Sequence, residues 1–547
     1  MRKGAKAAVV GTVFAVMVGG AGYGAYNIVS ALDGSGGGNG SSGTGVKAAP
    51  ARTGPPSSDE VQETAKKFFA AWEHAQPQEA ASYTNNAAKA EPLLSSYGED
   101  AHITDVHITP DAANGDMVPF SVRATVSFEG KSKPLSYRSS LRVVRGITTG
   151  RALVDWQPSL VHPALTGMDD TLVTGESSAP AIEAVDRNGK VLTKEKYPSL
   201  GPILDQLRKK YGQSAGGTPG IELSIQHADP DSADTTLLTL AAGKAGKLRT
   251  TLSAGVQAAA ERAVQKYGES SVVAVKASTG EVLAVANHRA DGFNAAFSGS
   301  VAPGSTMKII SAATLIDNGV TNANGPAPCT EDALWEGQTF HNYREMTDEG
   351  ATLAQSFARS CNTAFIKYVD DLDDDSLTRE AQDRFGLGRN NWHTGIASFD
   401  GKVPAVNGPD KAAALIGQGQ VQMSPLNMAS VTATAKTGTF RQPVIVPQSL
   451  DGRQLAHARG LSSGTARQLR TMMHRTATSG TAAGVMSGMS GVIGAKTGSA
   501  EVGGQAKTDS WFAGYRNDVA AAAMVQHGGH GTDAAGPIVA AVLRAGG

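Results

Sequence analysis

Ser305 and Lys308 are the first residues in this sequence whose types and spacing could do covalent chemistry. They lie three positions apart at the start of an apolar run, 309–313, so on a helix they would share one face, one turn apart. A serine at a helix N-terminus lies in the positive end of the helix dipole, and a buried lysine beside it can lose its proton and act as a base. The alternative is an N-cap serine followed by a solvated lysine, so S-x-x-K alone is a weak indication.

A second polar motif, Ser360-Cys361-Asn362, follows the helix-like run 351–359. A Ser-x-Asn tripeptide can simply be a turn. In the catalytic interpretation, the Ser360 hydroxyl relays a proton and the Asn362 amide orients the lysine and the substrate. Alone, this motif indicates less than the first one.

Lys-Thr-Gly occurs twice, and its context separates the two copies. Lys436 ends the helix-like run 424–435, so we predict a structural residue at a helix end. Lys496-Thr497-Gly498 instead follows an apolar pair and precedes a predicted strand over 511–515. We therefore expect the second copy on an edge strand that lines a groove.

The elements that must position these motifs lie in the segment 243–547. The pattern predicts a helix over 252–266, two strands within 271–287, strands over 511–515 and 519–525, and a closing helix over 534–544. Strands at both ends of a segment with helices between them indicate one sheet assembled from distant parts, with helices on its faces.

Two smaller segments precede it. In 59–163, a helix over 59–74 is followed by period-two strands over 120–128 and 135–143 and by a strand over 154–156, which indicates a small α+β domain with a structural or spacing role. In 164–242, short strand-like pieces alternate with Gly and Pro, and 184–192 reads as strand, Asn188-Gly189 turn, strand. We expect a linker or pedestal there.

The N-terminus indicates export. Arg2, Lys3 and Lys6 precede an uncharged run, 7–32, that is long enough to span a bilayer. The basic residues would keep 1–6 in the cytoplasm and place the rest of the chain outside. A cleaved signal peptide is the alternative, and it also exports the protein. The Gly-, Ser- and Pro-rich segment 33–58 is then a flexible tether.

Composition excludes several classes of protein. The chain has 547 residues with 49 basic and 50 acidic side chains, a balance that gives no reason to expect a nucleic-acid partner. Two cysteines, Cys329 and Cys361, exclude a disulfide-dense scaffold, and their spacing does not decide whether they pair. His527 and His530 are separated by glycines without a supporting carboxylate or cysteine pattern, so no metal site is expected.

Together, S-x-x-K, S-x-N and K-T-G in this order resemble the signature of penicillin-recognising serine enzymes. The chain resembles a class B penicillin-binding protein, a D,D-transpeptidase without a glycosyltransferase domain. The stretches at 385–388 (FGLG), 416–429 (IGQGQVQMSPLNMA) and 511–515 (WFAGY) look like further stretches of that family. The resemblance covers 243–547 strongly, while 184–192 resembles a degenerate form of an N-terminal stretch and 59–163 resembles the NTF2-like domain of MecA-type proteins.

The resemblance implies an α+β multidomain chain with a C-terminal serine β-lactamase/transpeptidase-like fold, an antiparallel sheet flanked by helices. It also implies roles in acylation. Ser305 attacks a D-Ala-D-Ala stem peptide or a β-lactam, and Lys308 accepts its proton. Ser360 relays a proton toward the leaving nitrogen, and Asn362 positions Lys308 and the substrate.

The resemblance further assigns substrate binding to the third motif. Lys496 and Thr497 take the terminal carboxylate, Gly498 allows close approach of the backbone, and the N–H groups of Ser305 and Ser499 form the oxyanion hole. No cofactor is implied. The expected partners are stem peptides, β-lactams, the membrane through the N-terminal helix, and other cell-wall synthesis proteins, with the catalytic domain extracytoplasmic.

Three alternatives remain open at this point. They are a D,D-carboxypeptidase, a class D-like serine β-lactamase, and a non-catalytic cell-wall scaffold. A class A β-lactamase requires a glutamate to activate the deacylating water, and no glutamate lies between Glu380 and Glu501. A scaffold would be expected to have lost Ser305 or Lys308.

Overall fold

The computed structural model describes residues 54–147, 149–229, 232–343, 346–503 and 506–547. The predicted cytoplasmic tail and membrane anchor, and most of the predicted tether, lie outside the described residues. Within the described ranges, no helix combines the length and the apolar character needed to span a membrane.

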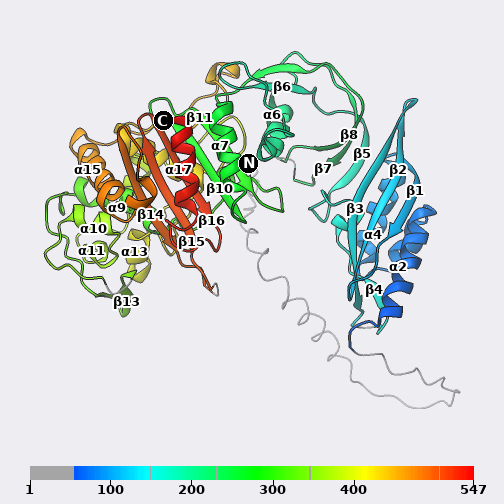
Figure 1. The fold of residues 1–547 in the computed structure, drawn as a ribbon, viewed down its shortest axis with the longest axis horizontal. Helices are drawn as coiled ribbons and strands as arrows, with labels where there is room; N and C mark the ends of the chain where they lie inside the picture. Colours follow the sequence, from blue (N-terminus) through cyan, green and yellow to red (C-terminus); the bar gives the residue numbers. More distant parts are fainter. Residues whose placement is uncertain (1–53, 148, 230–231, 344–345, 504–505) are drawn as a thin grey trace, which may run out of the picture. The chain divides into compact units, whose positions relative to one another are not determined.

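The N-terminal part is an α+β unit built on a four-stranded antiparallel sheet (Figure 1). Its elements are α2 (Ser58–Glu73), α3 (Pro77–Ser82), α4 (Ala87–Glu99), β1 (Ile103–Pro110), β2 (Met117–Phe128), β3 (Lys131–Arg145), β4 (Ala152–Val154) and α5 (Pro158–Val161). Ser57 starts α2 with a capping box to Glu60, and alternate residues of β2 are buried, as predicted.

The prediction missed β1, α3 and α4. Strand β1 contains polar residues and a register shift between Thr104 and His107, so the period-two pattern is broken there. The predicted strand over 154–156 is displaced by two residues: β4 spans Ala152–Val154. The Trp156 N–H donates to the Asn85 side chain (2.9 Å) rather than to a ladder.

The middle part contains an antiparallel sheet, β5-β7-β8, and a two-stranded parallel pair, β6 with β9. The elements are β5 (Thr171–Glu176), β6 (Ile182–Val185), η1 (Pro198–Leu200), α6 (Gly201–Tyr211), β7 (Ile221–Gln226), β8 (Thr235–Ala241) and β9 (Gly246–Arg249). The Asn188-Gly189 turn forms, with Asp186 accepting from the N–H groups of Asn188 and Lys190 (both 2.8 Å). The second predicted strand does not form. Val191 makes only an isolated bridge to Val185, and β6 takes its ladder partner from β9.

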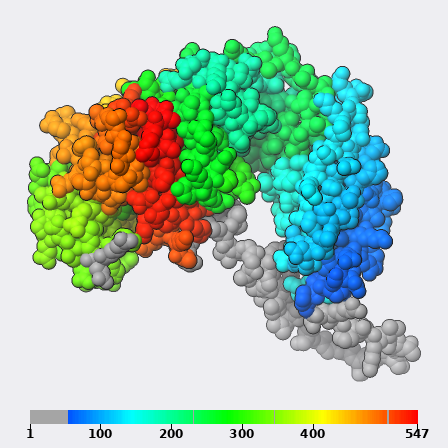
Figure 2. Space-filling view, in the orientation of Figure 1, coloured from blue at the N-terminus to red at the C-terminus, as the bar shows by residue number. Residues whose placement is uncertain are grey.

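The C-terminal part is organised by a five-stranded antiparallel sheet in the order β11-β10-β16-β15-β14. The strands are β10 (Ser270–Lys276), β11 (Val282–His288), β14 (Ile493–Ala500), β15 (Asp509–Arg516) and β16 (Val519–Val525). Strand β10 pairs with β16, which confirms a single sheet assembled from distant segments. In Figure 2, the red C-terminal residues accordingly lie against green residues that precede them by more than 200 positions.

Helices cover both faces of this sheet. On β10, Val272 and Ala274 pack in one apolar cluster with α7 (Ala254–Val264) and α17 (Ala535–Gly546), while Val273 and Val275 pack in another with α14 (Pro425–Thr437). Because successive side chains point to opposite faces, both faces of β10 and β16 are buried. Figure 1 shows α17 beside α7.

Most of the regular elements between β11 and β14 are helices. The elements are α8 (Ala295–Ser298), η2 (Gly304–Met307), α9 (Lys308–Asp317), β12 (Asp332–Trp335), β13 (Gln338–His341), α10 (Leu353–Arg359), α11 (Thr363–Ile366), α12 (Ser376–Asp383), α13 (Gly408–Leu415), α14, η4 (Gln448–Leu450), α15 (Ser463–Ser479) and α16 (Ala483–Met486). Strands β12 and β13 make a two-stranded hairpin.

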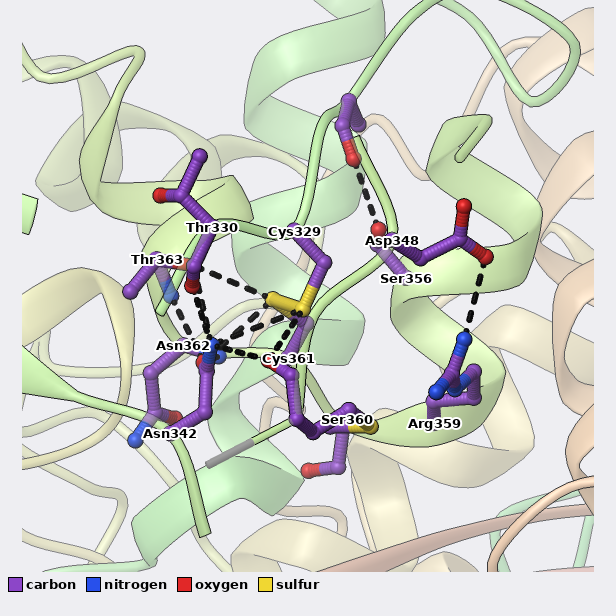
Figure 3. Close-up of a disulfide and its surroundings, with 12 residues drawn as sticks. Cys329, Thr330, Asn342, Asp348, Ser356, Arg359, Ser360, Cys361, Asn362 and Thr363 are labelled. Atoms are coloured by element: carbon purple, nitrogen blue, oxygen red, sulfur yellow. Dashed lines mark hydrogen bonds and ion pairs between the residues drawn. A yellow bond between two sulfur atoms is a disulfide. The ribbon is translucent and has the colours of Figure 1, made fainter. Parts of the chain in front are cut away.

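Cys329 and Cys361, whose pairing the sequence left open, form a disulfide with a Cα–Cα distance of 6.0 Å (Figure 3). The bond connects the loop before β12 to the turn between α10 and α11. It therefore attaches the segment that carries the β12–β13 hairpin to the Ser360–Asn362 motif.

Removing the side chain of Phe120 should destabilise the N-terminal unit. The ring is fully buried, with its centroid 4.8 Å from that of Phe69 and 6.2 Å from that of Trp72. We expect Phe120→Ala to cost about 3–5 kcal/mol in free energy of unfolding. Denaturant unfolding followed by tryptophan fluorescence measures it. Ile147→Ala, at a position 87% exposed, is the control and should change little; equal midpoints for the two variants would contradict the prediction.

Removing the disulfide should also lower stability. The cysteines are 32 positions apart, and closing a loop of that length constrains the unfolded chain by about 3–4 kcal/mol in the chain-entropy account. The Cys329→Ser/Cys361→Ser double variant should therefore unfold at a lower midpoint in calorimetry. Reductant should lower the midpoint of the wild type toward that of the double variant and leave the variant unchanged. A wild type insensitive to complete reduction would refute this stabilisation.

Candidate active site

The backbone around Ser305 fits between two other segments. Gly304, at φ +52°, lies so close to β14 that a Cβ there would come within 2.3 Å of the Ser499 carbonyl oxygen. On its other side, the Gly304 N–H donates to the Gly417 carbonyl (2.9 Å), and a Cβ on Gly417 would lie 2.0 Å from the Gly304 oxygen. Both positions require glycine. Gly417, in the 416–429 stretch, therefore supports the start of the S-x-x-K turn.

Lys308 lies fully buried at the first position of α9, with Nζ 3.1 Å from Ser305 Oγ. Nζ also donates to the Ser360 carbonyl (2.9 Å) and to Asn362 Oδ1 (2.7 Å). Burial, and then the charge of nearby Lys496, hold the pKa of Lys308 well below its usual range. In the neutral amine, the two N–H bonds satisfy these two acceptors, so the lone pair is left for the Ser305 hydroxyl.

The S-x-N motif forms the turn between α10 and α11. Ser360 ends α10 in the left-handed conformation (φ +63°), and Asn362 is the N-cap of α11. This backbone turn directs the Ser360 carbonyl toward Lys308, while Ser360 Oγ accepts a hydrogen bond from Lys496 Nζ (2.8 Å). Ser360 therefore connects the two buried lysines.

Lys496, Thr497 and Gly498 lie on β14, the strand at the end of the five-stranded sheet. Lys496 is fully buried, and burial lowers its pKa to about 7. A Cβ on Gly498 would lie 2.9 Å from the Thr306 methyl carbon and 3.0 Å from the Pro303 oxygen, so only glycine lets β14 approach the S-x-x-K turn.

The structure thus brings all three motifs together. Ser305, Lys308, Ser360, Asn362 and Lys496 form one continuous network of polar contacts. Thr497, Gly498 and Ser499 continue along the same strand.

Two residues that the sequence did not connect with the site contact β14 at or next to the third motif. Thr481 Oγ1 lies 2.6 Å from Thr497 Oγ1, and His530 Nδ1 lies 3.2 Å from Ser499 Oγ. The His530 ring also contacts the exposed ring of Tyr343, with centroids 4.1 Å apart. The 527–530 segment was expected to be a glycine-rich loop, and no spacing pattern connects it or Thr481 to the motifs.

The first Lys-Thr-Gly copy is a helix end, as predicted. Lys436 lies in the last turn of α14, which Gly438 ends at φ +81°. Its Nζ lies 5.9 Å from the ring centroid of Tyr515. Over the described residues, no group of three or more His, Cys, Asp or Glu side chains is arranged to hold a metal ion.

Comparison with known proteins agrees with this geometry. The family model "Penicillin binding protein transpeptidase domain" matches residues 270–544, and "NTF2-like N-terminal transpeptidase domain" matches residues 60–169. Curated relatives include the peptidoglycan D,D-transpeptidase PbpA of Mycolicibacterium smegmatis, which is 28% identical over an alignment of 357 positions; the match covers 55% of this chain and 71% of that protein. PbpA of Mycobacterium tuberculosis is 28% identical over an alignment of 355 positions, with the same coverage of 55% of this chain and 71% of that protein.

Solved structures share the fold. The Pseudomonas aeruginosa PBP2 structure in complex with WCK 5153 aligns with a TM-score of 0.54 at 21% identity, over 67% of this chain and 96% of that one. The D,D-transpeptidase domain of a peptidoglycan glycosyltransferase from Eggerthella lenta gives 0.52 at 20% identity, over 68% and 98%. With the family model matching half of the sequence, the chain belongs to the penicillin-binding protein transpeptidase family and carries an NTF2-like N-terminal domain.

Proposed function

We propose that this protein is a serine D,D-transpeptidase that cross-links peptidoglycan stem peptides through an acyl-enzyme and is acylated by β-lactams. The observation that carries the proposal is Lys308, a fully buried amine 3.1 Å from Ser305 Oγ whose two other hydrogen bonds both go to acceptors. A neutral amine in that position is a general base for the serine.

In the acylation step, Ser305 Oγ attacks the carbonyl carbon of the D-Ala-D-Ala peptide bond while its proton passes to Lys308. As the C–N bond breaks, the leaving nitrogen takes a proton through the Ser360 hydroxyl, and Lys308 returns to its neutral form. In a β-lactam the same bond lies within the ring, so the amine remains attached to the acyl group. The amine of a second stem peptide then attacks the ester and restores the Ser305 hydroxyl.

The third motif binds the substrate. Lys496 in its protonated form and the Thr497 hydroxyl take the terminal carboxylate, and Gly498 keeps β14 next to the nucleophile. The family resemblance assigns the oxyanion hole to the N–H groups of Ser305 and Ser499, donors of a type that contributes a few kcal/mol to transition-state stabilisation. The close approach of Gly304 to the Ser499 carbonyl is consistent with this pairing.

The location of the protein is part of the same proposal. The basic residues before the uncharged run 7–32 favour a single N-terminal membrane anchor with the catalytic domain outside. Other cell-wall synthesis proteins are the expected partners. A structure described as "Structural coordination of polymerization and crosslinking by a peptidoglycan synthase complex" shares the fold, with a TM-score of 0.52 at 20% identity, and makes such an assembly a reasonable candidate.

Intact mass spectrometry tests the activity. The full-length chain incubated with benzylpenicillin should gain the mass of one penicillin, and Ser305→Ala should gain none. The adduct should persist for hours, because no glutamate between Glu380 and Glu501 is available to activate a deacylating water. Rapid release of penicilloate would instead identify a β-lactamase.

Substrate turnover separates the remaining alternatives. A D-Ala-D-Ala stem-peptide mimic with an added acceptor amine should give the cross-linked product. Hydrolysis alone would identify a carboxypeptidase. If neither an adduct nor turnover occurs with a folded wild type, the chain is a non-catalytic scaffold and the proposed function is wrong.

The second-order rate constant for acylation should have a bell-shaped pH dependence. It should rise with pH as Lys308 loses its proton, because only the neutral amine accepts the serine proton. It should fall above about pH 7 as Lys496, whose pKa is about 7, loses the charge that binds the carboxylate. Lys496→Arg keeps that charge at all these pH values. In this variant, the fall of the rate constant on the alkaline side of the profile should therefore move to higher pH. A wild-type rate that still rises tenfold between pH 7 and pH 9 would contradict the assignment.

A further inference from the structure

We propose that Asn342, which follows strand β13, is a positioning residue for the reaction: it holds the Ser360–Asn362 turn in the conformation that orients Lys308. This inference rests on the proposed function. It concerns a side chain outside the three motifs.

The Asn342 amide uses all of its hydrogen-bonding capacity around this turn. Its Oδ1 accepts from the backbone N–H groups of Asn362 (2.7 Å) and Thr363 (3.1 Å). Its Nδ2 donates to the carbonyls of Thr330 (2.5 Å) and Met346 (3.0 Å). The side chain is buried, and an asparagine amide has two donors and two acceptor positions, all of them occupied here.

The N-terminus of helix α11 depends on Asn342 because the side chain of its own N-cap residue, Asn362, makes hydrogen bonds to other groups. An N-cap asparagine ordinarily accepts from the first N–H groups of its helix. Here Asn362 makes no such bond: its Oδ1 accepts from Lys308 Nζ (2.7 Å), and its Nδ2 donates to the His341 carbonyl (2.9 Å). The Asn342 side chain instead accepts from the N–H groups of Asn362 and of Thr363, the first residue of α11, and so holds this end of the helix while the Asn362 side chain binds Lys308.

Asn342 also connects the turn to the loop on the other side of the disulfide. Figure 3 shows its amide between Thr330, which follows Cys329, and the Asn362–Thr363 backbone. The disulfide fixes Cys361, the residue between Ser360 and Asn362. The two connections act on different atoms. The disulfide restrains the side chain of Cys361, while Asn342 orients the peptide groups of Asn362 and Thr363.

The position of this turn determines the geometry of the base. Both hydrogen-bond acceptors of Lys308, the Ser360 carbonyl and Asn362 Oδ1, belong to it. If the turn shifts, the Lys308 lone pair no longer faces Ser305. A misplacement of about 1 Å in such a site can cost about 100-fold in rate.

Stopped-flow acylation by a fluorescent penicillin tests the inference on the full-length chain. The experiment separates the first-order acylation rate constant from the dissociation constant of the initial complex. We expect Asn342→Asp to lower the rate constant about 10- to 100-fold, because its second carboxylate oxygen would face the Thr330 and Met346 carbonyls. Asn342→Ala should do the same. The dissociation constant should change less than threefold, because Lys496 and Thr497 bind the carboxylate.

Asn427→Asp is the matched control. Asn427 is also buried; its Oδ1 accepts from the Ser424 N–H (2.8 Å) and its Nδ2 donates to the Phe399 carbonyl (2.8 Å). The same substitution there should lower the melting temperature while the acylation rate constant stays within twofold of wild type. If Asn342→Ala does not fold, Asn342→Ser, which keeps a hydroxyl in the site, replaces it in the comparison.

The outcomes are distinguishable. If the wild type is not acylated, the proposed function fails. If the wild type is acylated and folded Asn342 variants react at the rate of Asn427→Asp, Asn342 has only a structural role and the inference is overturned. A loss of rate with unchanged affinity, absent from the control, supports it.

Discussion

Two buried lysines that donate to the same serine, Ser360, are the constraint on which the rest of this site depends: Lys308 donates to its carbonyl and Lys496 to its hydroxyl. Lys308 and Lys496 are both fully buried, and no ion pair with a carboxylate is found for either within the described residues. Two like charges cannot both remain ionised in such surroundings, so one amine is held neutral. A neutral and a charged lysine then divide the tasks of base and anion binding between them.

Burying two lysine amines costs free energy, so the surrounding fold has to hold them in place. Unpaired polar groups are expensive to bury, so each lysine needs acceptors at fixed positions. The Ser360 carbonyl, Asn362 Oδ1, Ser360 Oγ and the Thr497 carbonyl supply them. The sheet, with helices on both faces, provides the rigid edge on which Lys496 lies. The disulfide and the Asn342 amide fix the turn that faces it.

Much of the fold and of the site could be predicted from the sequence, because a periodic pattern of apolar residues indicates a helix or a strand. Alternation in β2 and the buried runs of β10 and β16 predicted strands, and the spacing of Ser305 and Lys308 predicted their contact. Context correctly separated Lys436 from Lys496. The order of the motifs then predicted the family.

What could not be predicted depends on contacts between segments without a periodic pattern. Asn342, Thr481 and His530 reach the site from loops and helix junctions, and nothing in their own spacing indicates it. The bulge in β1 removed the alternation on which strand prediction relies, and Val191 lost its expected ladder because β9, 55 or more residues away, pairs with β6 instead. The disulfide could not be predicted either, because the sequence does not show that Cys329 and Cys361 lie close together in the folded chain.

The close packing at Gly304, Gly417 and Gly498 has a consequence for how this protein can evolve. Any side chain at these positions would collide with backbone or with Thr306, so mutation there destroys the site rather than adjusting it. The rim of the site, where the Tyr343 ring contacts His530, is different, because the Tyr343 side chain is 53% exposed and a substitution there has solvent on one side. Heritable changes in the preference for different acyl donors would therefore accumulate at the rim, while the centre of the site stays invariant across descendants.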